Sequence, residues 1–419
     1  MKTNYREKLT GLAAFLLLTE IFYFYESYIT IAGFGVGYQY IGCMIVAALG
    51  FGLFLVDPDI DCFYHSVKTA GVLMIPYIII LLFSMTIWIF NFTPLRQIIS
   101  GFFEPAYMIL CLICAASLVY ILRDQMMEYA FWALSTVVGV MVLQRILKFG
   151  VFGFFERLSR YLISMGNEAT GVSLEATSFS YTFVFFGLYY IFHRKEDPVW
   201  KQLLRMLIIL FGLLVTFKRS GFMALAFGFV CAFVCFRLND RNRKLFLNFI
   251  IVLFILFAFF YIPIIRYGLF ERIATALDIN TSSRIRIYRY YADYYDFGIT
   301  YLGRGLGWVR RLMASAERFN VGLQSVNVHC DYVRLYIELG FWGYLFWIFT
   351  AFPWVVKGTA RGNSAENDAV ILGTCVALAS LRMTENISFL YSATLGMSIT
   401  IMQCSYNTKY RSGIQSRKT

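Results

Sequence analysis

The chain has 419 residues, of which 59% are hydrophobic and 15% are charged, and its formal net charge is +12. Its mean hydropathy of +0.64 and its recurring, nearly charge-free runs exclude an ordinary soluble domain, which is about a quarter charged. Each run is long enough to cross a bilayer as a helix. The predicted fold class is therefore an all-α polytopic membrane protein. The positive balance suits anionic lipids as partners and gives no indication of nucleic acid.

Taken in chain order, the apolar runs predict about twelve transmembrane helices. They lie at residues 10–25, 30–56, 69–91, 99–122, 127–149, 176–192, 202–217, 220–236, 245–265, 335–356, 368–382 and 387–404. The stretch 150–175 is half polar and ambiguous, and no internal repeat is found. The predicted organisation is nine spans in residues 1–265, one large loop in residues 266–334 between spans 9 and 10, and three spans with a tail in residues 335–419.

The distribution of lysine and arginine among the short loops predicts the orientation, because cytoplasmic loops carry an excess of both. With an even number of spans, the basic short loops fall on one side, which is then the cytoplasm and holds both termini. The large loop lies on the opposite side, and long loops are exempt from this rule. From Arg266 to Arg334 it contains ten arginines and no lysine. Arginine offers a planar, permanently charged fork that suits phosphate oxygens, although a solvated basic surface is the alternative interpretation.

Two candidate motifs precede the large loop. In "GVSLEATSFSYTFVFF", Glu175 lies where a polar outer stretch meets a span, so it is either an ordinary acid at a helix start or an acceptor for a sugar hydroxyl. In "TFKRSGFMALAFGFV", Lys218 and Arg219 separate two spans with almost no loop between them. Ser220 and Gly221 then begin a helix, whose N-terminal N–H groups favour anions. The alternative is that an arginine at a span end only extends to the membrane interface.

The large loop contains "TSSRIRIYRYYADYYDFGITYLGRGLGWV". Arg284, Arg286 and Arg289 follow serines that can cap a helix, and Arg284 and Tyr288 share one helical face. Tyrosines such as Tyr288 suit sugar stacking, with an interfacial aromatic belt as the alternative. The "GRGLG" at 303–307 is a tight glycine turn. It follows no clear strand and belongs to no βαβ unit, so a dinucleotide site is not indicated.

The loop ends in "VNVHCDYVRLYIELG". His329 is the one histidine that the predicted topology places outside, because His65 and His193 fall in cytoplasmic loops. Asp331 could orient the imidazole or bind sugar, and Tyr332 is a further candidate sugar contact. A capped helix start with a surface histidine is the alternative. His329 is thus the candidate for acid–base chemistry on this side near neutral pH.

The order of these motifs resembles the O-antigen polymerase and ligase superfamily, over about residues 165–350. The resemblance is carried by "KRSG" at a helix boundary, "SSR" followed by "GRGLG", and "HCDYVRLYIELGFWGYLF". "SLEATSFSY" is similar to the E-P-S element of many Wzy-type polymerases, with Ala176 in place of the proline. Cys330 stands where the family has asparagine, and Val333 where it has leucine.

The resemblance implies a GT-C-type, metal-independent glycosyltransferase of the bacterial cytoplasmic (inner) membrane, with its active site on the periplasmic face. The donor would be a glycan on undecaprenyl pyrophosphate, and by residue match Arg219, Arg284 and His329 would be the functional residues. A polymerase transfers the growing chain to another lipid-linked repeat unit, whereas a ligase transfers the finished chain to lipid A–core. The Glu175 element favours the polymerase. The implied partners are the lipid-linked donor and acceptor, membrane lipids and a chain-length regulator protein.

The expected chemistry suits these residue types. Displacing pyrophosphate from an anomeric carbon requires stabilisation of growing negative charge, which preorganised donors supply at roughly 3 kcal/mol each. Lys218, Arg286 and Arg289 are further candidate contacts to this anion. Neutral His329 would take the proton of the acceptor hydroxyl, a form of help typically worth about 10² to 10⁴ in rate.

A metal ion could also stabilise the leaving group, but no metal or other cofactor is expected. The carboxylate-rich "DPDID" (Asp57–Asp61) is predicted to be a solvated cytoplasmic loop, on the wrong side for the donor. A transporter for lipid-linked sugars is the alternative from another functional class. Such a protein is expected to carry charges through an internal cavity and to contain repeats.

Overall fold

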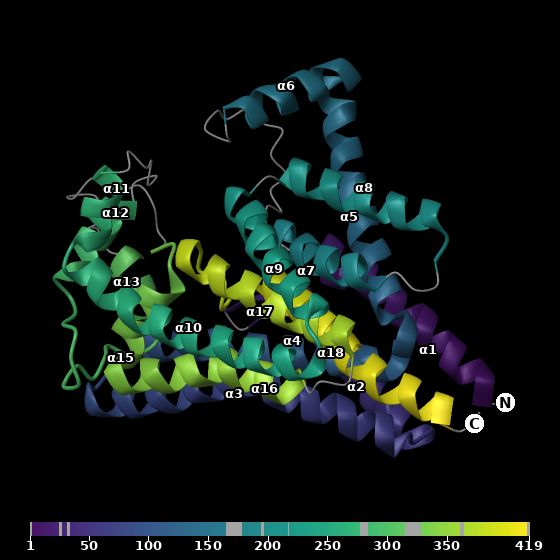
Figure 1. Ribbon diagram of the computed structural model, residues 1–419, viewed down its shortest axis with the longest axis horizontal. Coiled ribbons are helices and arrows are strands. Elements are labelled where there is room, and N and C mark those ends of the chain that lie inside the picture. The colour runs from purple at the N-terminus through teal and green to yellow at the C-terminus, as the bar shows by residue number, and fades with distance from the viewer. Residues whose placement is uncertain are drawn as a thin grey trace.

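The computed structural model is helical over nearly all the residues that it describes and confirms an all-α polytopic membrane protein (Figure 1). It describes residues 2–24, 27–31, 34–164, 178–193, 197–216, 218–276, 284–314, 328–360 and 364–416. Glu175 and the two serines before Arg284 lie outside these ranges.

The N-terminal part combines long helices with one short β-hairpin. Its elements are α1 (Lys2–Leu16), η1 (Leu17–Tyr23), β1 (Tyr28–Ile31), β2 (Phe34–Gly37), α2 (Tyr38–Val56), α3 (Ile60–Phe90), α4 (Leu95–Leu122), η2 (Arg123–Gln125), α5 (Met126–Phe149) and α6 (Val151–Ile163). The ambiguous stretch 150–175 therefore contains a helix, α6, over its described part.

The central part contains long helices and then three short ones. These are α7 (Phe179–Phe192), α8 (Val199–Thr216), α9 (Arg219–Arg237), α10 (Asp240–Arg266), α11 (Leu269–Ala276), α12 (Arg284–Ala292) and α13 (Trp308–Ala314). The short helices α11, α12 and α13 belong to the predicted large loop and lie together at one end of the molecule (Figure 1).

The C-terminal part returns along the bundle. Its elements are α15 (Asp331–Phe349), η3 (Thr350–Trp354), α16 (Val355–Thr359), α17 (Ala365–Thr384) and α18 (Tyr391–Ser416). Both termini lie toward the end opposite α11 and α12 (Figure 1).

Seven of the described helical segments are long and apolar enough to cross a membrane. They are Tyr38–Val56, Ile60–Phe90, Leu95–Phe149, Val199–Thr216, Arg219–Arg237, Asp240–Arg266 and Asp331–Thr359. Leu95–Phe149 contains two of the predicted spans, which meet at η2. Four other predicted spans are mostly helical but are too short or too polar to meet this requirement, namely 10–25, 176–192, 368–382 and 387–404. The total of twelve spans stays a prediction.

The predicted span 30–56 is wrong at its start. Strands β1 and β2 form an antiparallel hairpin, with Tyr28 opposite Gly37, and helix α2 begins only at Tyr38. The segment mixes β-branched residues with glycines, and each glycine in a helix interior costs about 1 kcal/mol. Hydropathy alone did not distinguish this hairpin from a span.

The stretch "DPDID", predicted to be a solvated loop, is half-buried or exposed and also has a structural role. Asp59 accepts a hydrogen bond from the Cys62 N–H at 3.1 Å and so caps the start of α3. The same carboxylate pairs with Arg123 at 2.8 Å. This acidic stretch therefore fixes a helix start.

Helices α9 and α17 pack closely and bring distant parts of the sequence together. A Cβ built on Gly228 of α9 would lie 2.7 Å from the carbonyl oxygen of Gly373 in α17, so this crossing requires small residues. Ser220, at the start of α9, hydrogen-bonds Glu385, just beyond the end of α17, at 3.3 Å. The two helices therefore run antiparallel, with the start of α9 beside the end of α17.

Helix α15 is interrupted at Gly340, whose φ is +71°. The interruption leaves carbonyl groups without intrahelical partners, and the "GRGLG" turn supplies two donors. The Arg304 N–H binds the Ile337 carbonyl at 3.0 Å, and the Gly305 N–H binds the Glu338 carbonyl at 2.8 Å. The glycine turn therefore clamps the large loop onto α15.

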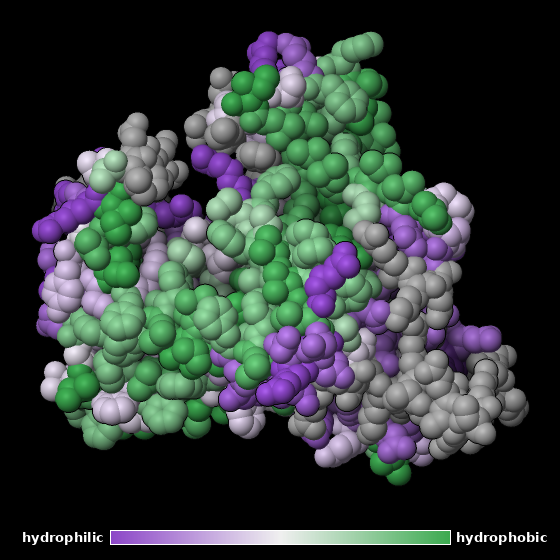
Figure 2. Space-filling model, in the orientation of Figure 1, coloured by the Kyte–Doolittle hydropathy of each residue, from purple (hydrophilic) through white to green (hydrophobic). Residues whose placement is uncertain are grey.

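Hydrophobic residues cover the middle of the visible face, and hydrophilic residues gather over α11 and α12 at one end (Figure 2). A second hydrophilic patch lies toward the opposite end of α10 (Figure 2). This is the pattern of a helix bundle with an apolar middle and two polar ends, as expected for a protein that spans a bilayer.

Candidate functional site

Four segments that are far apart in the sequence meet at one end of the bundle. They are the start of α9, the start of α12, the start of α15, and the link between α17 and α18. The contacts among them centre on the carboxylate of Glu385, the first residue after α17. We call Lys218, Ser220, Arg284, His329 and Glu385 the Glu385 cluster.

Glu385 binds both the candidate histidine and the "KRSG" motif. Its Oε2 lies 3.5 Å from Nδ1 of His329, and its Oε1 lies 3.9 Å from Nζ of Lys218. The Ser220 hydroxyl donates to Oε1 at 3.3 Å. One carboxylate therefore connects two of the three sequence motifs.

Arg284 brings the third motif to the same place. Its Nη2 donates to the Thr384 carbonyl at 3.1 Å, one residue before Glu385, and among the described residues this is its one side-chain hydrogen bond. A guanidinium has five N–H donors, so most of its donors stay available for a ligand. Arg219 is exposed at the first position of α9 and lies close enough to Tyr161 of α6 to act on its pKa.

The charges of the cluster keep Glu385 ionised. Burial opposes the charged form, but the hydrogen bond from His329, the charge of Lys218 and the charge of Arg284 outweigh it and lower the pKa of Glu385 below its ordinary value. The carboxylate is only 16% exposed, whereas the His329 side chain is 35% exposed. An ionised acid thus holds a histidine that a substrate can still reach.

The backbone at His329 is strained and held in place. His329 has φ +52°, a conformation that non-glycine residues rarely adopt. On its C-terminal side, the Cys330 N–H donates to Asn386 Oδ1 at 3.2 Å, and Asp331 Oδ2 accepts from the Ser388 N–H at 2.6 Å. These two bonds fix the start of α15 against the link that carries Glu385, and so position the imidazole.

The same contacts account for Cys330 and Asp331. Cys330 is fully buried, and burial raises the pKa of its thiol to about 11, so the thiol stays neutral at physiological pH. Asp331 is also fully buried and binds backbone, not the imidazole, in the contacts given above. Its predicted role in orienting the imidazole or binding sugar stays a prediction.

The structure does not bring all the predicted residues into the cluster. Tyr332 is buried and donates to the Ala379 carbonyl at 3.0 Å, and Tyr288 lies on the buried side of α12. Arg289 pairs with Glu271 at 2.5 Å, and Arg286 is exposed on the same helix. Their predicted roles as substrate contacts stay predictions, as does that of Glu175, which lies outside the described residues.

Glu385 was not predicted as a site residue. A signal for it was present, because the predicted topology places the short link 383–386, "MTEN", on the same side as the large loop. An acid in such a link, between two apolar runs, is a candidate partner for the arginines and the histidine on that side.

The described residues contain no group of three or more His, Cys, Asp and Glu side chains that could hold a metal ion. The expected metal independence stays a prediction. What the cluster offers is positive charge for an anion and an oriented imidazole for a proton.

Comparison with known proteins supports the family indicated by the motifs. No curated protein matches the chain. Residues 204–348 match the family described as O-antigen ligase, and this range contains Lys218, Arg219, Arg284 and His329. Glu385 lies outside it. The match over residues 204–348 supports the O-antigen polymerase and ligase superfamily.

Proposed function

We propose that this membrane protein is an inverting polysaccharide polymerase that uses a glycan on undecaprenyl pyrophosphate as its donor. The observation that carries the proposal is the convergence of Lys218, Arg284 and His329 around Glu385. The family match supports a glycosyltransferase-like membrane enzyme.

The reaction follows from these positions. The acceptor hydroxyl attacks the anomeric carbon of the donor, and the bond from that carbon to the pyrophosphate oxygen breaks. The hydroxyl proton passes to His329. Glu385 accepts a hydrogen bond from Nδ1, so the neutral imidazole carries its proton there and keeps Nε2 as the base. The leaving pyrophosphate takes both electrons of the broken bond, and Lys218, Arg219 and Arg284 stabilise its charge.

An O-antigen ligase is the second candidate, because the matching family is described by that activity. Both enzymes would share the donor chemistry and therefore the Glu385 cluster. They differ in the acceptor, which is a lipid-linked repeat unit for the polymerase and lipid A–core for the ligase.

Deletion of the gene in its host distinguishes the two activities. Loss of a polymerase leaves single repeat units attached to the cell surface, whereas loss of a ligase leaves finished polymer on the lipid carrier.

The direct test uses purified full-length protein in lipid nanodiscs with lipid-pyrophosphate-linked repeat units. We expect polymer from the wild type and none from His329→Ala. Absence of product from correctly folded wild-type protein, or its appearance only with lipid A–core, would overturn the polymerase proposal.

A further inference from the structure

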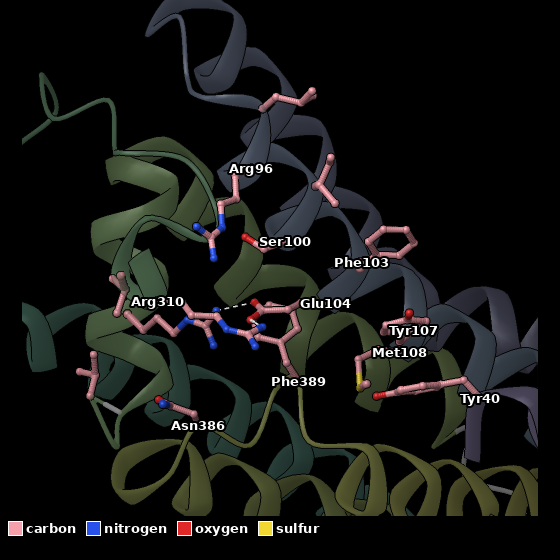
Figure 3. Close-up of a pocket in the computed structure, with 15 residues that line it drawn as sticks. Tyr40, Arg96, Ser100, Phe103, Glu104, Tyr107, Met108, Arg310, Asn386 and Phe389 are labelled. Carbon is pink, nitrogen blue, oxygen red and sulfur yellow. Dashed lines mark hydrogen bonds and ion pairs between the residues drawn. The ribbon is translucent and has the colours of Figure 1, made fainter. Parts of the chain in front are cut away.

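A cavity opens beside the Glu385 cluster. Its volume is about 930 Å³, within the range of about 300–1,000 Å³ typical of small-molecule sites. Val328 and Asn386, which line it, are the immediate neighbours of His329 and Glu385 in the chain. Most of its wall comes from α4, so we call it the α4 cavity (Figure 3). Lys218, Arg219 and Arg284 do not line it.

One side of the α4 cavity carries an excess of positive charge. Arg96, Arg310 and Arg334 line it together with a single carboxylate, Glu104. Glu104 pairs with the buried Arg334, and Arg334 is also bound by Glu338 at 3.2 Å. Arg310 reaches Glu104 more loosely, at 3.6 Å, and its side chain is 67% exposed. Arg96 forms no hydrogen bond or ion pair with any described residue, and its guanidinium points into the cavity (Figure 3).

The three arginines of the cavity differ in whether carboxylates neutralise them, and therefore in whether they can bind a ligand. Arg334 is neutralised by the half-buried Glu104 and the buried Glu338 and fixes Glu104 in place. Arg96 and Arg310 are exposed and face the same space (Figure 3). Two incompletely neutralised guanidinium groups favour an anion of the ligand.

The other side of the cavity is aromatic. Tyr107 stacks on Tyr40, with ring centroids 3.9 Å apart and an interplanar angle of 11°. Phe103 continues the stack, 5.5 Å from Tyr107 at 22°. These rings offer flat apolar surface, and the Ser100 hydroxyl and the Asn386 amide lie across the cavity, on the side of Arg96 and Arg310 (Figure 3). Flat rings with a few polar groups suit the C–H face and hydroxyls of a sugar ring.

We propose that the α4 cavity is the binding site for the acceptor glycan and takes a sugar residue that carries an anionic group. The inference rests on the proposed transferase function. Donor pyrophosphate occupies the Glu385 cluster, and the acceptor sugar enters from the α4 cavity, which borders His329 through Val328. The anion on an acceptor has two sources: a carboxylate on the sugar itself or the pyrophosphate of its lipid carrier. The aromatic stack beside Arg96 and Arg310 favours the sugar.

Binding to purified full-length protein in nanodiscs tests the site without turnover. The probes are a uronic-acid disaccharide, the same disaccharide with its carboxyl group reduced to an alcohol, and inorganic pyrophosphate. We expect the acidic disaccharide to bind at least tenfold more tightly than the reduced one. The double variant Arg96→Gln/Arg310→Gln should lose that preference, about ten- to a hundredfold in affinity for two charged hydrogen-bond donors.

The matched control is Arg311→Gln. Arg311 is exposed on the same short helix as Arg310, α13, but does not line the cavity, so the substitution removes one of the two charges lost in the double variant without touching the site. Tyr107→Ala should weaken binding severalfold and Tyr107→Phe should preserve it, because stacking depends on the ring.

Equal binding of the acidic and reduced disaccharides overturns the proposal, and so does a loss of affinity in Arg311→Gln equal to that in the double variant. Tighter binding of pyrophosphate, lost in the double variant, assigns the cavity to a lipid headgroup and also overturns it.

The transfer assay separates this proposal from the proposed function. With the wild type active, the double variant should raise the KM for the acceptor and leave the KM for the donor unchanged. A protein that binds the acidic disaccharide but transfers nothing would contradict the transferase and leave the site standing. A protein that transfers but shows no acidic preference would contradict the site alone.

Discussion

Apart from Arg334, which is bound by Glu104 and Glu338 near the start of α15, the arginines at the two ends of the helix bundle differ in their partners. At the end where α5, α8, α10 and α17 begin, arginines are buried against more than one carboxylate. Arg205 pairs with Glu128 at 2.6 Å and with Asp197 at 2.5 Å, and Arg243 pairs with Asp368 at 3.1 Å and with Asp240. Arginines of this kind are neutralised within the protein and hold helix ends together.

The Glu385 cluster at the other end is different. Lys218 and His329 share the Glu385 carboxylate, and Arg284 has no carboxylate partner among the described residues, nor does Arg219 between Lys218 and Ser220. The charge there is incompletely balanced, which favours an anionic ligand. The difference teaches that the number of arginines in a loop matters less than how many carboxylates the fold brings to them.

The largest expected effect comes from His329. His329→Ala should lower the transfer rate by about 10² to 10⁴, because general-base help is lost. His329→Asn is a second variant, since asparagine tolerates the positive φ at this position better than alanine. Transfer rates with purified protein measure both.

His193 provides the control for this prediction. It binds Asn367 at 2.7 Å near the opposite end of α17, away from the cluster. His193→Ala should leave the rate per folded molecule unchanged. Wild-type rates in His329→Ala would remove the histidine from the mechanism.

The next largest effect should come from Arg284 of the cluster and from Arg219, which lies between Lys218 and Ser220 in the chain. Arg284→Lys and Arg219→Lys keep the charge but lose the planar fork, and a lost charge-stabilising donor costs about 10² to 10³ in kcat. Turnover measured under saturating donor checks this. Near-normal turnover in Arg219→Lys would show that Arg219 only extends to the membrane interface.

Glu385→Gln tests whether Glu385, which was not predicted from the sequence, positions His329. Loss of the carboxylate should lower kcat by about ten- to a hundredfold, as for a charged hydrogen bond, with little change in donor KM. Glu385→Asp should recover part of the rate. Glu128→Gln breaks an ion pair at the opposite end, so it should lower stability and leave kcat per folded molecule intact. Equal effects of both substitutions on kcat would erase the contrast between the two ends.

The smallest expected effect is a pH dependence of stability. The pKa of Glu385 is lowered in the folded protein from an ordinary value of 4.5, so its ionised form stabilises the fold above that pH. This contribution is lost as the pH falls through the lowered pKa. Thermal unfolding of the wild type and Glu385→Gln should therefore differ at neutral pH and converge in acid. If the difference in stability between the two proteins grew as the pH fell, the ionised carboxylate would destabilise the fold, which contradicts this prediction.

The sequence was sufficient to predict the fold class and the motifs that meet at the cluster. Arg219, Arg284 and His329 were recognisable because each is a polar residue at the edge of an apolar run or in a loop of unusual composition. Their meeting point was not predictable, because it depends on the antiparallel crossing of α9 and α17 at Gly228 and Gly373. Spacing along one chain does not reveal such a crossing.

The misplaced start of the second span has a similar cause. The hairpin of β1 and β2 is as apolar as a transmembrane helix, and only its pairing distinguishes it. The acid of the α4 cavity, Glu104, was missed as well, although a lone carboxylate inside the apolar run 99–122 was a usable signal. Charged residues inside apolar runs therefore deserve the same weight as those in recognisable motifs.

The central claim is that His329 and Glu385 act as one unit on a transferred sugar. A double-mutant cycle measures this directly, with transfer rates for the wild type, His329→Ala, Glu385→Gln and the double variant. If Glu385 works through His329, the double variant should be no slower than His329→Ala. A double variant slowed by the full product of the two single effects would show that they act independently, and would contradict the account.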